Sequence, residues 1–344
     1  MKKKLFAAVS MAVMLATAGP AFAAGELHIF NWGNYTNPDL IKKFEKAFDI
    51  KVTLDDYDSN ETMLSKVRAG NSGYDVVVPS DYTVKIMIEE SLLDKTEPNQ
   101  MANYKNIRPE AANVYWDDGR HYSVPWQFGT TNFTVNTDKY KGDIDTLGIL
   151  FNPPDELKGQ INILDDINSV MHAAERYVGV PRCGADKADL KKVNDALQAA
   201  KPFWKTFSYD TITKITSGDV AVTQQWNGAS YRARQKMASL KYAYPKEGVE
   251  GWMDNVAVLK GAANLDNAKL FQNFVMDPAN AALISDFAGY DNGITGSHDF
   301  AASKDWAVSA ELNPPADAPK PEFVPPCAPE VVEIYNKIWT NLKK

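Results

Sequence analysis

The sequence predicts an α/β protein of two domains, and two observations support this prediction. Segments typical of strands and helices alternate along residues 26–88 and again along residues 160–252, which predicts a mostly parallel sheet flanked by helices. The chain has 344 residues, and the 321 that follow a predicted leader suit two domains of ordinary size. Ligands of such folds bind beyond the carboxyl ends of the strands.

The leader is residues 1–23. Three lysines follow Met1, an apolar run covers residues 5–18, and Ala21-Phe22-Ala23 ends the segment, as in a secretory signal peptide. The apolar run is shorter than the about 20 residues that span a bilayer, which disfavours the alternative of a membrane anchor. We expect cleavage after Ala23 and export of the remaining chain.

Charge and cysteine content limit the possible partners. The formal net charge is −7, and removing the leader takes away three lysines and no acid, which moves it to −10. An acidic chain is unsuited to nucleic acid and favours cationic ligands. Cys183 and Cys327 predict one disulfide in an exported protein, with two buried thiols as the alternative. The four histidines lack metal-ligand spacing, so we expect no metal and no cofactor.

In the first alternating region, each predicted strand precedes a predicted helix. The strands are residues 26–32, 50–54 and 74–78. Pro38 opens the first helix, Ser59 or Asn60 caps the second, and Ser80 or Asp81 caps the third. Trp32 and Ser80 therefore lie just beyond strand ends.

The second region and the remainder of the chain follow the same pattern. Predicted strands are 161–164, 220–224 and 255–259, and predicted helices are 169–177, 187–207, 266–276, 278–288 and 331–339. A proline-rich run, residues 314–329, contains Cys327 and precedes the last amphipathic helix. We expect this run to be an ordered loop rather than a flexible linker.

Aromatic side chains with nearby acids recur along the chain. They occur in Asn31-Trp32-Gly33-Asn34-Tyr35, Val78-Pro79-Ser80-Asp81-Tyr82, Trp226-Asn227-Gly228 and Trp252-Met253-Asp254. The faces of Trp and Tyr attract a cation, and a carboxylate forms a charge-assisted hydrogen bond with it. These clusters predict a cleft that holds a small amine. Ordinary core packing is the alternative for each aromatic residue, and a helix cap is the alternative for Ser80.

The hypothesis that the protein is an enzyme has no support from catalytic motifs. The sequence has no G-x-S-x-G, H-E-x-x-H, Walker or G-x-G-x-x-G motif. Pairs of acids such as Asp55-Asp56 and Asp117-Asp118 are more typical of solvated loops than of acid/base catalysis. We therefore expect a binding protein, and a secreted enzyme is the more distant alternative.

The chain resembles the periplasmic polyamine-binding proteins of ABC importers, the spermidine/putrescine-binding family, over nearly its whole mature length. The segments that carry the resemblance are Phe30–Tyr35, Tyr57–Met63, Tyr74–Tyr82, Ser123–Trp126, Trp226–Gly228, Pro245–Gly248 and Trp252–Asp254. The resemblance implies a type II-like periplasmic binding fold, with two α/β lobes and a ligand cleft between them. It divides the chain into a first lobe of 24–135 plus 254–300 and a second lobe of 136–253 plus 301–344.

The resemblance also implies roles for individual residues. Trp32 and Tyr35 match aromatic contacts to the ligand, and Ser80 and Tyr82 match polar contacts from the first lobe. Trp226 and Trp252 match the aromatic walls of the second lobe. Asp166 matches a carboxylate for a distal amine. Asp254 matches the carboxylate that pairs with one ammonium group, and we expect it to be the strongest determinant of binding because a buried acid needs a partner. Tyr290 is a further candidate, because its loop follows a helix and precedes an expected crossover.

One position departs from the family pattern. After the strand at 161–164, the polyamine binders have Asp-Asp-x-Arg-Glu, whereas this chain has Asp165-Asp166-Ile167-Asn168-Ser169. A serine at 169 removes a charge-assisted bond and disfavours a long triamine. A zwitterion such as γ-aminobutyrate or an opine is therefore the alternative ligand, with Arg182 and Arg232 as candidates to meet its carboxylate. A ferric-ion binder of similar architecture is a weaker alternative.

The resulting expectation is a monomeric periplasmic substrate-binding protein. It would bind a putrescine- or spermidine-like amine and deliver it to an inner-membrane ABC permease, with the lobes closing around the ligand.

Overall fold

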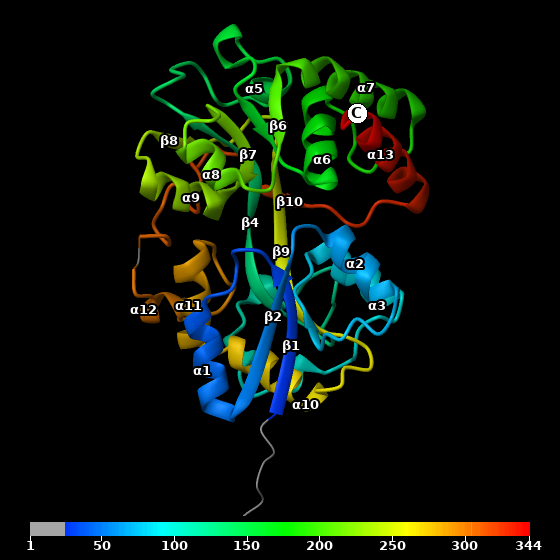
Figure 1. The fold of residues 1–344 in the computed structure, drawn as a ribbon, viewed down its shortest axis with the longest axis vertical. Helices are drawn as coiled ribbons and strands as arrows, with labels where there is room; N and C mark the ends of the chain where they lie inside the picture. Colours follow the sequence, from blue (N-terminus) through cyan, green and yellow to red (C-terminus); the bar gives the residue numbers. More distant parts are fainter. Residues whose placement is uncertain (1–24, 304) are drawn as a thin grey trace, which may run out of the picture.

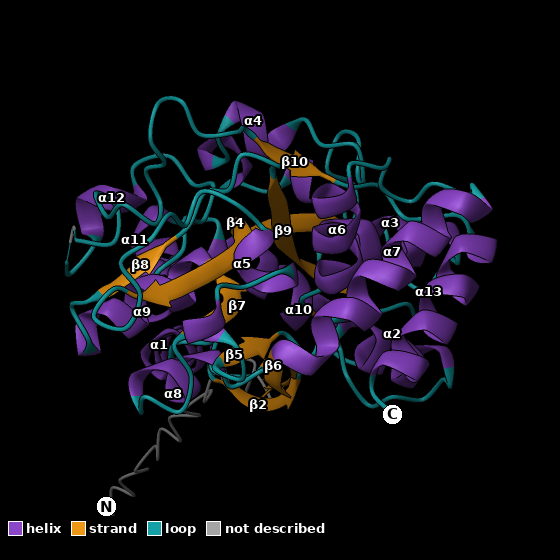
Figure 2. Cartoon of the chain, turned by 90° about the horizontal axis from the view of Figure 1, so that it is seen from above, coloured by secondary structure: helices purple, strands orange, loops and turns teal. Residues whose placement is uncertain are grey.

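In the computed structural model, which describes residues 25–303 and 305–344, ten strands form a single sheet. The predicted signal peptide lies outside the described residues. The main strand order is β2-β1-β3-β9-β4-β7-β5-β6, with β10 beside β9 and β8 beside β4. Helices surround the sheet (Figure 2). The predicted α/β class is confirmed.

One lobe forms the lower half of Figure 1 and holds one apolar core. Its elements are β1 (Gly25–Trp32), α1 (Pro38–Phe48), β2 (Ile50–Tyr57), α2 (Asn60–Arg68), β3 (Val76–Val77), α3 (Asp81–Glu89), α4 (Pro109–Ala112), α10 (Leu265–Val275), α11 (Pro278–Ala288) and α12 (Ser297–Phe300). β2, β1 and β3 are parallel. Leu40 and Phe44 of α1 are fully buried in this core.

The other lobe forms the upper half of Figure 1. Its elements are α5 (Gly148–Phe151), β5 (Ile161–Ile163), α6 (Ile167–Val178), α7 (Lys187–Ala200), β6 (Trp204–Phe207), α8 (Thr211–Thr216), β7 (Val222–Trp226), α9 (Asn227–Lys236), β8 (Leu240–Tyr242) and α13 (Pro329–Leu342). β7, β5 and β6 are parallel. Each lobe therefore has a parallel set of three strands.

Two long antiparallel strands, β4 (Ser123–Asn136) and β9 (Val249–Val258), run from one lobe to the other (Figure 1). In β4, Trp126 packs into the first core and Phe133 into the second. The lobe boundaries at 135/136 and 253/254 stay predictions.

Three segments differ from the sequence-based expectation. The helix expected over 187–207 ends at Ala200, because Pro202 cannot continue it, and residues 204–207 form β6 instead. The strand expected over 74–78 is reduced to β3. At one end the backbone NH of His28 donates to the Asp75 carboxylate, and at the other end the Val78 carbonyl accepts from the Trp32 indole. The strand expected over 255–259 begins earlier, at Val249, where it pairs with β4 and β10.

The proline-rich run belongs to the folded structure, as predicted. It contains β10 (Pro321–Phe323), which adds to β9 as a parallel strand. Figure 1 shows this segment crossing the waist of the molecule on its way to α13. Among the described residues, no helix combines the length and apolar character that a membrane span requires.

Candidate functional site

A cavity of about 330 Å³ lies at the junction of the two lobes. Elements from both lobes supply its walls, including the carboxyl end of β1, the start of α3, the start of α6, the end of β7 and the middle of β9. All ten candidate residues from the sequence line it: Trp32, Tyr35, Ser80, Tyr82, Asp166, Ser169, Trp226, Trp252, Asp254 and Tyr290. The structure thus brings together residues that are far apart in the chain.

Asp254 is a buried carboxylate whose hydrogen-bonding partners are neutral hydroxyl groups. Ser80 Oγ donates to its Oδ1 at 2.7 Å, and Tyr35 OH donates to its Oδ2 at 2.9 Å. Burial raises the pKa of Asp254 to about 7, although these two hydrogen bonds lower it in part. A cation in the cavity would supply the charge that the hydroxyl groups lack.

Ser80 is held for this contact rather than for helix capping. It occupies the position before α3, yet its side chain makes no capping hydrogen bond. Asn60 Nδ2 donates to Ser80 Oγ at 3.1 Å and to the Tyr82 hydroxyl at 2.9 Å. Asn60 also lines the cavity, and it therefore orients two of the predicted polar contacts.

The aromatic side chains form connected walls. Trp32 is fixed by a bond from its Nε1 to the Val78 carbonyl at 2.9 Å. Trp252 lies edge-on to Tyr290, with ring centroids 5.2 Å apart, and Trp226 packs against Tyr209 at 5.1 Å. Tyr209, which follows β6, is not among the residues that the sequence predicts for the site, since β6 itself was not predicted as a strand.

A second carboxylate, Glu250, also lines the cavity and was missed as well. In a strand, every second side chain points to the same face, so Glu250, Trp252 and Asp254 of β9 share one face. His172 Nδ1 lies 2.9 Å from Glu250 Oε1. Burial raises the pKa of Glu250, but the bond with His172 and the charge of Arg176 bring it below the ordinary value. The period of β9 was the signal that could have revealed this residue.

Asp166 and Ser169 lie next to Glu250 at the start of α6. Asp166 caps this helix, since its Oδ1 accepts from the Ser169 backbone NH at 2.7 Å. Burial raises the pKa of Asp166, and the nearby charge of Glu250 raises it further. Ser169 is 7% exposed, and its polar side chain helps to lower the pKa of Glu250.

Hydrogen bonds join the two lobes beside the cavity. Asn168 Nδ2 of the second lobe donates to Glu61 Oε1 at 3.1 Å and to the Tyr82 hydroxyl at 3.0 Å. Arg232 Nη1 donates to the Asn34 carbonyl at 3.3 Å. The lobes are therefore closed upon each other.

Of the two arginines considered for a ligand carboxylate, Arg232 lines the cavity. Arg182 instead pairs with Glu322 of β10. The acidic lining residues are Asp81, Asp166, Asp210, Glu250 and Asp254, whereas Arg232 and His172 are the basic ones. The cavity is thus predominantly acidic.

The predicted disulfide between Cys183 and Cys327 is present. Ligand atoms of His172, Cys183 and Cys327 lie within 4.8 Å of one another among the described residues. Because a metal binds a thiolate and both sulfurs are oxidised in the disulfide, this group cannot act as a thiolate metal site in the disulfide form.

The fold and the cavity between its lobes define the class of protein: a two-lobe receptor for a small ligand. Comparison with known proteins agrees, since residues 39–314 match the family described as bacterial extracellular solute-binding protein. The chain belongs to this family. It is therefore a solute-binding protein rather than an enzyme.

Named relatives cover nearly the whole chain. A putrescine-binding periplasmic protein, SpuD, from Pseudomonas aeruginosa is 30% identical and covers 99% of both chains. The spermidine/putrescine-binding periplasmic protein of Escherichia coli is 31% identical over 84% of this chain and 83% of its own length. Among solved structures, a putative spermidine/putrescine ABC transporter from Listeria monocytogenes superposes with a TM-score of 0.86 at 31% identity, over 93% of this chain and 99% of its own.

Proposed function

We propose that this protein is the periplasmic substrate-binding component of an ABC importer and that it binds a polyamine. The observation that carries the proposal is the cavity lining, in which five carboxylic acids and several aromatic faces outweigh one arginine and one histidine. Polyamines combine ammonium groups with an aliphatic chain, and this lining suits both parts. The names of the relatives support the same ligand class.

Binding begins with one ammonium group at Asp254. The group displaces no charged partner, because Ser80 and Tyr35 are neutral, and it turns the buried acid into a buried ion pair. The aliphatic chain of the ligand then lies along Trp252 and Trp226, whose rings line the cavity. Hydroxyl groups of Ser80 and Tyr35 hold the carboxylate in position for this contact.

Closure of the lobes completes the site. The contacts of Asn168 with Glu61 and Tyr82, and of Arg232 with Asn34, join the lobes in the arrangement that the structure shows. A ligand that bridges the lobes favours this arrangement by its greater affinity for it. The closed monomer then presents both lobes together to the membrane permease.

The test is binding of a ligand panel to the purified mature protein, measured by thermal shift and then by calorimetry. The panel contains putrescine, spermidine, γ-aminobutyrate and an opine. A ligand that binds only the folded state raises the melting temperature by mass action, and we expect this for the di- and triamines. Stabilisation by γ-aminobutyrate or the opine alone would overturn the polyamine proposal and direct attention to Arg232.

A further inference from the structure

A second group of carboxylates, Glu250 and Asp166, lines the cavity away from Asp254. We propose, resting on the proposed function, that Glu250 joins Asp166, to which the family resemblance already gives this role, in binding the distal ammonium group of the ligand. Glu250 thereby adds to the preference for amines with two charged ends over monoamines. Glu250 is a cavity-lining carboxylate on the same strand face as Asp254.

Strand geometry sets the distance between the two ends. Glu250 and Asp254 are four residues apart in β9, which corresponds to roughly 13 Å between their Cα atoms. Trp252 lies midway on the same face and also lines the cavity. The wall therefore presents a carboxylate, an aromatic face and a second carboxylate in a row. An amine with an aliphatic middle and charged ends matches this order.

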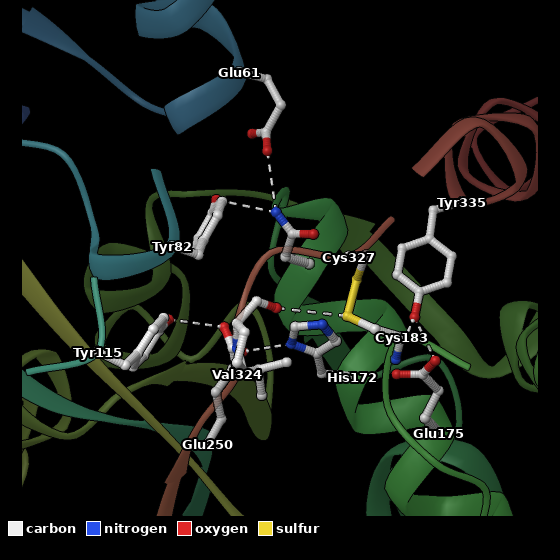
Figure 3. The surroundings of a disulfide bond; sticks show 12 residues. Glu61, Tyr82, Tyr115, His172, Glu175, Cys183, Glu250, Val324, Cys327 and Tyr335 are labelled. Carbon is white, nitrogen blue, oxygen red and sulfur yellow. Dashed lines mark hydrogen bonds and ion pairs between the residues drawn. A yellow bond between two sulfur atoms is a disulfide. The ribbon is translucent and has the colours of Figure 1, made fainter. Parts of the chain in front are cut away.

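His172 holds Glu250 in place for this role. A carboxylate only accepts hydrogen bonds, so His172 Nδ1 donates to Oε1 of ionised Glu250. Figure 3 shows His172 directed at Glu250 beside the disulfide. In the part of the chain that the structure describes, the His172 ring is hydrogen-bonded to the Glu250 carboxylate, and Arg176 contributes charge without such a contact. The remaining acceptor capacity of the carboxylate is available to a ligand.

The small side chain at 169 makes room for Glu250. Ser169 is the third residue of α6 after its cap, a position where glutamate is common in helices. A glutamate there would bring a third carboxylate against Asp166 and Glu250, whereas the neutral serine adds no further negative charge to this part of the cavity. The acid of this end of the cavity is thus supplied by β9 instead of α6.

The first experiment compares Glu250→Gln with the parent by calorimetry, using spermidine, putrescine and butylamine as probes. Losing one charge-assisted bond should weaken spermidine binding by about ten- to hundredfold. Butylamine, which has a single ammonium for Asp254, should bind to both proteins with similar affinity. Equal losses for all three amines, or no loss for any, would overturn the inference.

Two further variants serve as controls. Glu175→Gln removes a buried acid of α6 that pairs with Tyr335 and does not line the cavity, so it should leave the preference for spermidine over butylamine unchanged. The double change Ser169→Glu with Glu250→Gln moves the carboxylate to the helix and should restore spermidine binding. A double variant as weak as Glu250→Gln alone would contradict the assignment.

The unaltered protein provides a test that does not depend on a variant folding. Diamines of increasing chain length are each compared with the monoamine of the same length. Once the chain reaches the second end, the diamine should bind about tenfold or more tightly than its monoamine. If the parent binds no amine, the proposed function itself fails. If it binds diamines and monoamines equally at every length, only the role of Glu250 fails.

Discussion

The two ends of the cavity carry the same chemical group, a carboxyl, and the pKa values of these two carboxyls are shifted in opposite directions. Asp254 and Glu250 are both buried carboxylates on one face of β9. Asp254 has hydroxyl partners, and its pKa is raised to about 7. Glu250 has a histidine partner and an arginine nearby, and its pKa is lowered.

The difference shows that burial alone does not decide the charge of an acid. Desolvation raises the pKa at both ends, and at Glu250 the hydrogen bond with His172 and the charge of Arg176 outweigh it. A ligand ammonium at Asp254 would play the part that His172 and Arg176 play at Glu250. The Asp254 end is therefore completed by the ligand, whereas the Glu250 end is charged before the ligand arrives.

The largest expected effect comes from Asp254→Asn. Removing one partner of a buried charge pair costs about 2–5 kcal/mol, which is roughly a thirtyfold to several-thousandfold loss in amine affinity. Calorimetry with spermidine and with butylamine measures this loss, and both amines should be affected. The variant should fold normally, because the amide removes a buried acid while still accepting a hydrogen bond from Ser80.

Melting of the ligand-free variant supplies the control for Asp254→Asn. Its melting temperature should equal or exceed that of the parent at neutral pH. Butylamine bound as tightly by the variant as by the parent would show that Asp254 is not the site of the first ammonium group.

Breaking the disulfide should lower the free energy of unfolding and, to a smaller extent, the affinity for spermidine. Cys183 and Cys327 are separated by 144 residues, and removing such a link typically lowers the free energy of unfolding by about 2–4 kcal/mol. Cys327 ends the segment that contributes Val324 to the cavity wall (Figure 3), and Cys183 lies near His172. A variant with serine at both positions should also lose spermidine affinity more than butylamine affinity. Urea unfolding and calorimetry measure the two effects, and equal losses for both amines would contradict the link to the Glu250 end.

The two ends should also differ in their response to pH. Asp254 must be ionised to pair with ammonium, so amine affinity should rise by about tenfold per pH unit below pH 7 and level off above it. The ligand-free protein should behave in the opposite way. A raised pKa means that the folded state holds the proton between about pH 4 and 7, so the contribution of Asp254 to stability falls as pH rises through this range. The lowered pKa of Glu250 acts with the opposite sign, because the unfolded state takes up this proton first as pH falls, so the contribution of Glu250 to stability is lost toward acid pH.

Calorimetry near pH 6 in two buffers of different ionisation enthalpy measures the protons released on binding. We expect close to one proton for the parent and much less for Asp254→Asn. Equal proton release in both proteins would assign the titration to another acid, of which Asp81 is the first candidate, since burial raises its pKa to about 7 as well.

Much of the fold could be predicted because local pattern and tertiary structure agree. The Pro38 helix and the strand of β1 follow from apolar periodicity and capping. β6 could not be predicted, since its four residues form a strand only through pairing with β5. β9 was predicted too short for a related reason: its first half is fixed by pairing with β4 and β10, which lie far away in sequence.

The candidate site was predictable where an aromatic or acidic residue belongs to a recognisable cluster. Asp254 follows Trp252 and Met253, and this grouping pointed to it. Glu250 stands outside any such cluster, and its position on the cavity face depends on a strand that begins five residues before Asp254. The sequence shows that Ser169 stands where the family has an acid. Only the folded structure shows that Glu250 of β9 lies near this position.

The smallest expected effect concerns the aromatic wall between the two ends. Trp226→Ala removes one aromatic face and should weaken amine binding by about 0.5–2 kcal/mol, roughly twofold to thirtyfold. Because this wall contacts the aliphatic part that both ligands share, spermidine and butylamine should lose affinity by similar factors. Trp226→Phe should retain most of the affinity. Trp339→Ala, on α13 and outside the cavity lining, is the matched control and should lower only the melting temperature. A loss of affinity confined to spermidine would show that Trp226 contacts the distal part of the ligand near Glu250 rather than the aliphatic part that both amines share.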